Sequence, residues 1–317
     1  MRFLFDLIIF LILFFSAYWM YVIVRSFFYD KEKQAKTKIV RICIVALLLF
    51  CFLIVSWGSF IESNRIVIKQ TNLNYNQTVE KETLKIAFVS DTHVGPYKKN
   101  WFLNRVVDKI ISEQPDIVLL GGDYILSREK NAKYLEPFKR LSAKYPTFAV
   151  TGNHEFKMGK PNDKRQKDRT ATLRKLFAEW NIPILDNQTQ IVETKHGSIN
   201  ITGIPDIWTE LDDLEVAKLD SDPEAPKILL AHNPSIILDK EAESFDLVLS
   251  GHTHAGQIRL PWIGPLATPT MDLDKRFDQG IFKLKNGYLY ITAGLGESGA
   301  RARLFNPPEI TILNLDL

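Results

Sequence analysis

Five short segments of the sequence contain residue types that bind metal ions and transfer protons. The segments are Asp91-Thr-His93, Gly121-Gly-Asp123, Gly152-Asn-His-Glu155, Ala231-His232-Asn233 and Gly251-His-Thr-His254. Together they contain five of the six histidines of the chain. A combination of imidazole and carboxylate without thiolate suits divalent ions such as Mn, Fe, Zn or Mg rather than a structural cysteine–zinc site. The donors exceed what one ion needs, so the segments predict a metal centre.

Each segment directly follows, or ends, a short apolar run that is predicted to be a strand. These runs cover residues 84–90, 117–120, 147–150, 227–231 and 247–250, and further strands are predicted at 189–194, 199–204, 281–284, 288–292 and 310–315. Amphipathic runs near 100–112, 131–144 and 170–180 are predicted to be helices. This alternation is typical of an α/β layered domain, in which catalytic groups collect at the carboxyl ends of strands.

Taken singly, each segment is common in unrelated proteins, whereas the order of all five along one chain is specific. In this order the sequence resembles the calcineurin-like metallophosphoesterase superfamily, whose signature runs Asp-x-His, Gly-Asp, Gly-Asn-His-Glu, a single His and Gly-His-x-His. The resemblance covers about residues 84–317, and every element of the signature is present. It implies a four-layer αββα sandwich with the metals above the ends of the strands.

The resemblance also implies a role for each matching residue. It assigns Asp91, His93 and His254 to a first metal, Asn153, His232 and His252 to a second, and Asp123 to a bridge between them. Two ions about 3.5–4 Å apart clamp phosphate oxygens and lower the pKa of a bound water, so hydroxide becomes available near neutral pH. His154 stays unligated in this scheme and is expected to act as a general acid on the leaving oxygen.

Other side chains near these segments have less specific assignments. Glu155 is a candidate for orienting His154, although such a carboxylate is commonly solvated or capping. Arg301 and Arg303 follow a glycine-rich turn and are candidates for holding a second phosphate group. The apolar residues Trp101, Trp208, Trp262 and Leu266 are expected either in the core or as apolar walls and membrane contacts near the site.

The first sixty residues differ in character from the rest of the chain. Residues 3–24 contain a single charge, Asp6, and residues 42–61 contain none, so each run is long and apolar enough to cross a bilayer as a helix. Buried helices of a soluble protein would show polar residues every third or fourth position. We therefore predict a transmembrane hairpin over residues 1–61, a polar linker over residues 62–83, and a catalytic domain over residues 84–317.

Basic residues gather between the two predicted spans, and few flank their other ends. They are Arg25, Lys31, Lys33, Lys36, Lys38 and Arg41. The positive-inside rule therefore predicts a multi-pass protein of the cell membrane with a cytoplasmic loop and an extracytoplasmic catalytic domain. Both cysteines, Cys43 and Cys51, lie in the second span. The formal net charge of +3 does not predict nucleic acid as a partner, and no obligate protein partner is evident.

Two further stretches, 251–261 and 306–310, resemble the membrane-associated bacterial branch of the superfamily, which includes relatives that act on lipid-type diphosphates. Anchoring also favours a membrane substrate because it raises effective concentration. We therefore predict a binuclear-metal phosphoesterase that hydrolyses a phosphodiester or diphosphate bond of a lipid or lipid-linked substrate. The alternatives are an anchored phosphatase for soluble nucleotides or phosphoproteins, a non-catalytic membrane scaffold and a metal sensor; the complete donor set argues against the last two.

Overall fold

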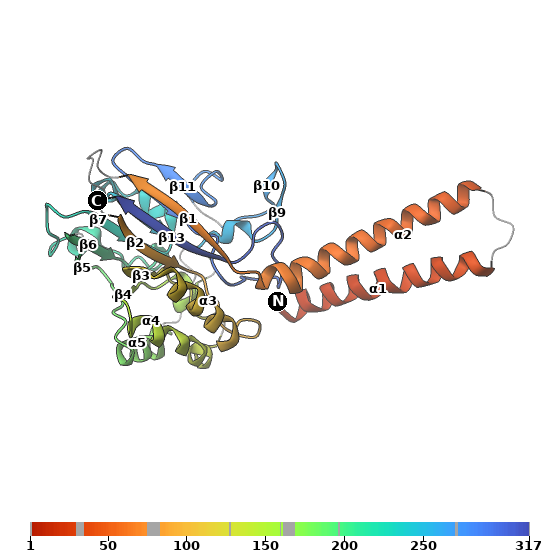
Figure 1. Ribbon diagram of the computed structural model, residues 1–317, viewed down its shortest axis with the longest axis horizontal. Coiled ribbons are helices and arrows are strands. Elements are labelled where there is room, and N and C mark those ends of the chain that lie inside the picture. Colours follow the sequence, from red (N-terminus) through yellow and green to blue (C-terminus); the bar gives the residue numbers. More distant parts are fainter. Residues whose placement is uncertain are drawn as a thin grey trace.

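The protein consists of a layered α/β domain and two long helices that extend from one end of it (Figure 1). The computed structural model describes residues 2–29, 35–74, 83–126, 128–158, 160, 169–195, 197–269 and 272–316. The helices α1, Arg2–Tyr29, and α2, Ala35–Ser56, lie side by side as a hairpin. Two short helical turns, η1, Trp57–Ile61, and η2, Glu62–Asn64, continue α2 into the domain.

The surface of the hairpin is apolar on nearly every side. Exposed side chains include Phe10 and Trp19 of α1, and Leu47 and Phe50 of α2. A helix of this composition in a soluble core would bury such residues, and here few are buried. Both helices are long and apolar enough to cross a bilayer.

The first sheet has five strands and brings segments from both ends of the chain together. Its order is β1, Val67–Asn74; β13, Glu309–Asp316; β2, Thr83–Val89; β3, Ile117–Leu120; and β4, Thr147–Ala149. Strand β13 runs antiparallel to β2, whereas the other three pairs are parallel. The carboxyl ends of β2, β3 and β4 therefore lie at one edge of this sheet.

The second sheet has six strands. Its order is β11, Gly280–Lys283; β12, Tyr288–Ile291; β8, Leu247–Ser250; β7, Lys227–Leu230; β6, Gly197–Gly203; and β5, Gln188–Thr194. The four central strands are parallel, and both edge strands are antiparallel to their neighbours. A separate ribbon of β9, Arg259–Leu260, and β10, Gly264–Pro265, lies near the base of the helical hairpin (Figure 1).

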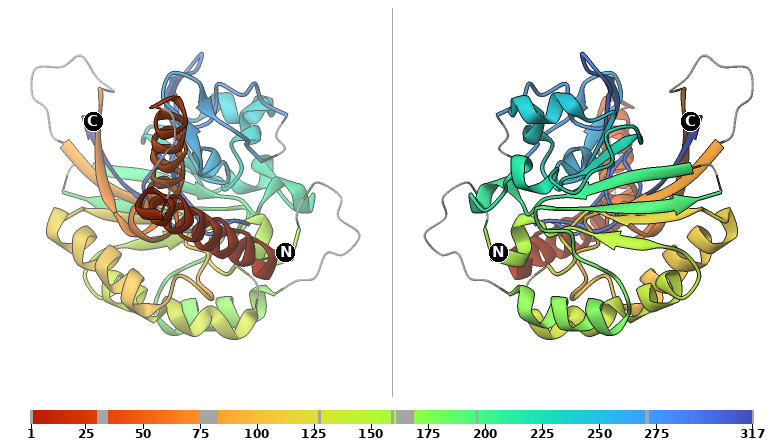
Figure 2. Two further views of the ribbon diagram at one scale, coloured as in Figure 1. Left: turned by 90° about the vertical axis from the view of Figure 1, so that its right-hand side faces the viewer. Right: turned by 90° about the vertical axis from the view of Figure 1, so that its left-hand side faces the viewer.

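The two sheets pack face to face over a buried apolar core. Phe88 and Leu119 of the first sheet belong to one buried cluster with Ile201 and Leu249 of the second. Because side chains alternate along a strand, the outer faces of both sheets are also apolar and must be covered. Helices α3, Asn100–Glu113, and α5, Thr170–Glu179, pack on the outer side of the first sheet, and short helices pack on the second (Figure 2). The predicted sandwich of two sheets is confirmed.

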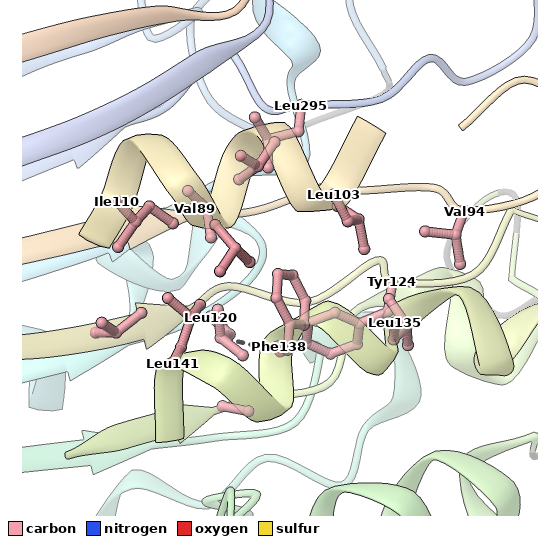
Figure 3. Packing of buried hydrophobic residues seen from close by; sticks show 14 of the residues in the cluster. Val89, Val94, Leu103, Ile110, Leu120, Tyr124, Leu135, Phe138, Leu141 and Leu295 are labelled. Atoms are coloured by element: carbon pink, nitrogen blue, oxygen red, sulfur yellow. Dashed lines mark hydrogen bonds between the residues drawn. The ribbon is translucent and has the colours of Figure 1, made fainter. Parts of the chain in front are cut away.

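The cover of the first sheet shows why these residues form helices. In α3, Phe102, Val106 and Ile110 recur at helical spacing and are buried against the sheet. Figure 3 shows Phe138 beside Leu120 in this layer. The remaining helical segments are η3, Glu129–Phe138; α4, Lys139–Ser142; η4, Asn153–Phe156; η5, Ile207–Thr209; α6, Leu214–Ala217; η6, Pro234–Leu238; η7, Lys240–Ser244; and η8, His254–Gly256.

Two predictions about local structure need correction. The segment 62–83, predicted to be a linker, contains η2 and strand β1, and the first sheet therefore begins at Val67 instead of near residue 84; residues 75–82 lie outside the described part. Strand β1 is at the edge of the sheet and half exposed, so it carries few apolar residues. The helix predicted at 131–144 is a 3-10 helix followed by one α-turn, since Pro137 removes a donor within it.

Candidate metal centre

The five chemistry-bearing segments all begin where a parallel strand ends. Asp91 and His93 follow β2, Asp123 follows β3, and Asn153 and His154 follow β4. In the second sheet, His232 follows β7, and His252 and His254 follow β8. Ligands gather at such strand ends because the loops that leave neighbouring parallel strands lie side by side. The structure brings all eight side chains to the same edge of the sandwich.

A first cluster consists of Asp91, His93, Asp123 and His254, which are all buried and whose donor atoms lie within 4.8 Å of one another. His254 Nε2 lies 3.4 Å from Asp91 Oδ1, and His93 Nε2 lies 3.5 Å from Asp123 Oδ2. The two Nε2 atoms are 3.0 Å apart. Convergence of imidazole and carboxylate electron pairs on one small space suits a divalent cation.

Burial determines the protonation of the two histidines in this first cluster. It lowers the pKa of His93 well below the usual value, and nearby His154 acts in the same direction. Burial likewise lowers the pKa of His254, with a further contribution from the charge of Arg303. The neutral imidazole is the form that binds metals, so both rings fit the cation that the donor set implies.

A second cluster consists of Asp206, His232 and His252, again buried and with donor atoms within 4.8 Å of one another. Asn153 adjoins it, because its Oδ1 lies 3.1 Å from His252 Nδ1. His232 Nδ1 lies 2.7 Å from the carbonyl oxygen of Gly121, to which it donates when it carries the proton. That contact turns the other ring nitrogen, Nε2, towards the centre, as in histidines that bind metals.

Asp123 borders both clusters. Its Oδ2 lies 3.5 Å from His93 Nε2 on one side and 3.3 Å from His232 Nε2 on the other. Although burial opposes protonation of His232, the carboxylates of Asp123 and Asp91 raise its pKa well above the usual value. The negative charge at the centre of the site therefore attracts positive charge, which a cation can supply in place of a proton.

The backbone is strained at these residues. Asp91, His93, Asp123, His252 and His254 all have φ between 43° and 68°, in the left-handed region that residues other than glycine rarely adopt. Such strain costs free energy and persists where the surroundings enforce it, commonly at functional sites. One of these surroundings is the close approach of Gly251, because a Cβ at that position would lie 2.3 Å from Asp91 Oδ2.

His154 differs from the other predicted site residues. It belongs to neither cluster, and it is partly exposed whereas the others are buried. Its ring stands edge-on to the ring of His93, with centroids 4.6 Å apart. Its backbone N–H donates to Asp123 Oδ1 over 2.8 Å. The side chain therefore lies next to the centre and is partly accessible to solvent.

Glu155 binds different groups from the neighbouring His154 ring that its sequence position indicates. Its buried carboxylate accepts hydrogen bonds from the backbone N–H groups of Asp123, Tyr124 and Gly152 at 2.9–3.0 Å. Burial, reinforced by the charge of Asp123, raises its pKa to about 8. Through these bonds Glu155 fixes the loops after β3 and β4 to each other, and no bond to the ring of His154 is found in the described structure.

Arg303 does not hold a phosphate, contrary to the sequence prediction. Its side chain is fully buried and donates to the backbone carbonyl oxygens of Ala293, Gly294 and Gly296, among others. The turn that it fixes bonds to Asp91, because the N–H of Gly296 donates to the carbonyl oxygen of Asp91 over 2.6 Å. Arg303 therefore acts through the backbone on the loop that carries the first cluster.

Asp206 is the site residue that sequence analysis missed. It follows β6 in the sequence Gly203-Ile-Pro-Asp206, so its place just after a strand was the available signal. Its Oδ1 accepts the N–H of Trp208, and its Oδ2 is buried without a hydrogen-bond partner among the described residues. The ring of Trp208 stands edge-on to His252 at 4.7 Å and closes this side of the site.

The model of the calcineurin-like phosphoesterase family matches residues 84–256, which contain both clusters. The chain belongs to this family. A calcineurin-like phosphoesterase domain accounts for the two-sheet sandwich and for the two candidate cation sites at its edge. Individual ligand roles are taken up under the proposed function.

Three relatives indicate which calcineurin-like phosphoesterases the chain is similar to. It is 33% identical over 268 residues to an uncharacterized metallophosphoesterase of Helicobacter pylori, covering 82% of this chain and 66% of that protein. It is 30% identical over 233 residues to phosphodiesterase YaeI of Escherichia coli, covering 73% of this chain and 82% of that protein. It is 28% identical over 303 residues to UDP-2,3-diacylglucosamine pyrophosphatase LpxG of Chlamydia trachomatis, covering 81% of this chain and 91% of that protein. The chain spans 60–66% of the length of the metallophosphoesterases of Campylobacter jejuni and Helicobacter pylori that it matches.

Proposed function

We propose that the protein is a membrane-anchored hydrolase that uses two divalent cations to cleave a phosphodiester or diphosphate bond of a lipid or lipid-linked substrate. The observation that carries the proposal is the position of Asp123, whose carboxylate borders two separate clusters of buried donors. A site for one structural ion would need neither a second cluster nor an open side. Two ions that share a carboxylate are the arrangement that hydrolyses phosphate esters.

The two clusters support the ligand assignment that the family resemblance implies. Asp91, His93 and His254 would hold one cation, Asn153, His232 and His252 would hold the other, and Asp123 would be available to both. We add Asp206 to the second cation, either as a ligand or as the carboxylate that orients the ligands. When bound, the two cations neutralise phosphate oxygens and lower the pKa of an attacking water.

The side chains of the protein supply the remaining steps. His154 lies at the open side of the centre, where its ring can donate a proton to the leaving oxygen. Glu155 keeps the loops of Asp123 and Asn153 at a fixed separation through its bonds to the backbone. Trp208 excludes water from the side of His252.

The helical hairpin supports the proposal that this chemistry takes place at a membrane. Both helices expose apolar side chains and bury few, which suits a lipid surrounding better than water. Arg25 lies near the end of α1, and Lys36, Lys38 and Arg41 lie near the start of α2, at the end of the hairpin away from the domain (Figure 1). By the positive-inside rule this charge favours a domain outside the cytoplasm. A reporter enzyme fused to the carboxyl terminus should be active only on the extracytoplasmic side, and activity confined to the cytoplasm would reverse this orientation.

The relatives support a lipid-linked substrate. The name of LpxG describes a pyrophosphatase for UDP-2,3-diacylglucosamine, in which a diphosphate is attached to an acylated sugar, and YaeI is named as a phosphodiesterase. Anchoring adds a physical reason, because it confines enzyme and lipid to one surface and raises their effective concentration. The competing function, an anchored phosphatase for soluble nucleotides or phosphoproteins, would gain nothing from that confinement.

The test uses the full chain in lipid nanodiscs with bis-p-nitrophenyl phosphate and with a total lipid extract. We expect hydrolysis of both with Mn²⁺, none with a chelator, and none by Asp123→Ala. The lipid products identify the substrate class. Hydrolysis of nucleotides without any lipid product would favour the competing function, and absence of all hydrolysis with a full metal content would refute the enzyme proposal.

A further inference from the structure

A cavity of about 320 Å³ lies between the metal centre and the base of the helical hairpin. Its walls are mostly apolar and come from three places in the fold: the loop from Thr253 to Ile258, the segment from Leu266 to Pro269, and the turn from Ser298 to Ala300. Phe5 of helix α1 completes it. We call this space the hairpin cavity.

The hairpin cavity adjoins both the first cluster and the membrane helices. His254 lines it and also belongs to the first cluster. At the other side, Phe5 is adjacent to Asp6, whose Oδ2 accepts a hydrogen bond from Tyr97 of the domain over 2.6 Å. An apolar space thus begins beside a candidate metal ligand and ends beside an apolar helix, so a molecule that lies in it contacts both.

The position of the cavity along the hairpin corresponds to the surface of a bilayer. Helix α1 has 28 residues, a length of about 42 Å at 1.5 Å per residue, whereas the hydrocarbon core of a bilayer is about 30 Å thick. Some of the helix must therefore lie at headgroup level. The charged Asp6, held by the domain, marks that part, and Phe5 lies next to it.

The rim of the cavity has the composition of a surface that contacts lipid. The ribbon of β9 and β10 lies beside the hairpin base (Figure 1) and exposes Trp262 completely, Ile263 to 72% and Leu266 to 60%. Exposed apolar side chains in a group mark an interaction surface, and tryptophan favours the interface between lipid and water. Arg301 adds positive charge next to Ala300, stacked over the rings of Phe60 and Tyr97 at 5.0 Å each.

We infer that the hairpin cavity receives an acyl chain of a membrane lipid whose phosphate group lies at the adjacent metal centre. This inference rests on the proposed membrane-anchored phosphoesterase function and adds to it a binding site for the acyl chain of the substrate. The apolar walls favour a hydrocarbon chain over a sugar or a nucleoside, which would leave polar groups unpaired there. The acyl chain of the lipid enters from the side of α1, so the substrate never has to leave the membrane surface completely.

The experiment compares a series of p-nitrophenyl alkyl phosphates, from ethyl to octyl, with the full protein in nanodiscs and Mn²⁺. Each methylene that leaves water favours binding by about fourfold, from roughly 0.8 kcal/mol per CH₂, until the cavity is filled. We expect kcat/KM for the octyl ester to exceed that for the ethyl ester by about tenfold or more. An equal kcat/KM for all chain lengths would overturn the inference while leaving the phosphoesterase function intact, and failure to hydrolyse any ester would instead count against that function.

Two variants separate the cavity from simple partition of long chains into the nanodisc. Leu266→Asp puts a charge in the apolar wall, and Ala300→Phe fills part of the space. In both, the ratio of octyl to ethyl kcat/KM should fall towards one. The matched control is Leu219→Asp, an exposed leucine outside the cavity, which should keep the wild-type ratio. A chain-length preference that persists in both cavity variants would arise from partition and would overturn the inference.

Discussion

The two donor clusters lie next to each other, but different parts of the molecule hold them in place. The first is connected to the base of the hairpin: the side chain of Asn306 donates to the carbonyl oxygen of His254 over 2.7 Å, and its backbone N–H donates to Glu62 over 2.8 Å. The backbone N–H of Arg303 donates to Gly58 over 3.0 Å in the same region. A change where the helices join the domain is therefore expected to reach the first cluster.

The second cluster is enclosed by the sandwich itself. The ring of His232 bonds to Gly121, in the loop after β3, and the ring of Trp208 packs against His252. Asp206 lies in the loop after β6, on the side of the second sheet. The first cluster is thus bonded to the base of the helical hairpin and the second to the packed sheets, with Asp123 as the residue that both share.

Replacement of Asp123, the residue that both clusters share, should affect both clusters equally. Asp123→Ala removes the carboxylate that borders both, so both cations should be lost and activity should fall by more than about 10³-fold, beyond the range of a single electrostatic donor. Metal analysis of the purified protein by mass spectrometry checks this. Asp108→Ala, an exposed carboxylate paired with Arg140, is the control and should keep its metal. If Asp123→Ala retains one full equivalent of metal ion, the two clusters bind their cations independently.

Removal of the proposed acid should leave both clusters as they are. His154→Ala should lower kcat by about 10²–10⁴-fold, the usual contribution of a general acid, with metal content equal to wild type. The loss should be smaller for a substrate with a good leaving group such as p-nitrophenol, which needs little protonation. Loss of metal together with activity would make His154 a ligand instead.

A change confined to the second cluster should weaken the binding of one cation only. Asp206→Asn should lower the affinity for one Mn²⁺ by about 10–100-fold, as for residues that orient metal ligands, and high Mn²⁺ should restore activity. Calorimetric titration of metal-free protein measures both affinities. The control is Asp213→Asn, an exposed cap of α6, which should titrate like the wild type. An unchanged titration in Asp206→Asn would remove this residue from the site.

The smallest expected effect tests the connection of the first cluster to the anchor. Asn306→Ala removes one hydrogen bond to the carbonyl of His254, which corresponds to about 1 kcal/mol or roughly fivefold in the affinity of the other Mn²⁺. The same titration should show weaker binding of the cation at the first cluster and unchanged binding at the second cluster, which is the opposite of the result for Asp206→Asn. Equal weakening of both would mean that the clusters respond as one unit.

The sequence was sufficient for those parts of the site in which residue type and order are both informative. Asp-x-His and Gly-His-x-His each place donors directly after an apolar run, and the structure finds the runs as strands and the donors at their ends. The helix at Asn100–Glu113 and the two long apolar helices were predictable for the same reason, since their periodicity or length is unambiguous. Their ligand roles stay predictions.

The sequence was insufficient where a role depends on contacts far along the chain. Asp206 is a lone aspartate after a strand, and only the fold brings it to His232. Glu155 was expected beside its neighbour His154 and instead bonds to the backbone of a different loop. Arg303 was a candidate for holding a second phosphate group, but the backbone carbonyl oxygens of four residues accept its hydrogen bonds in the interior. Strand β1 was missed because an edge strand needs few apolar residues.

Strand β1 also determines how far the catalytic domain can move from the helical hairpin and, in the proposed arrangement, from the membrane. A flexible tether over residues 62–83 would let the domain reach about 25 Å from the bilayer, from the dimensions of a random coil. In the structure only Arg65 and Ile66 separate the last helical turn of the hairpin from β1, which pairs with β13 along its whole length. In the proposed membrane-anchored arrangement, this short connection would hold the domain at one height and in one tilt, and the protein would meet its substrates by diffusing in two dimensions with the surrounding lipids.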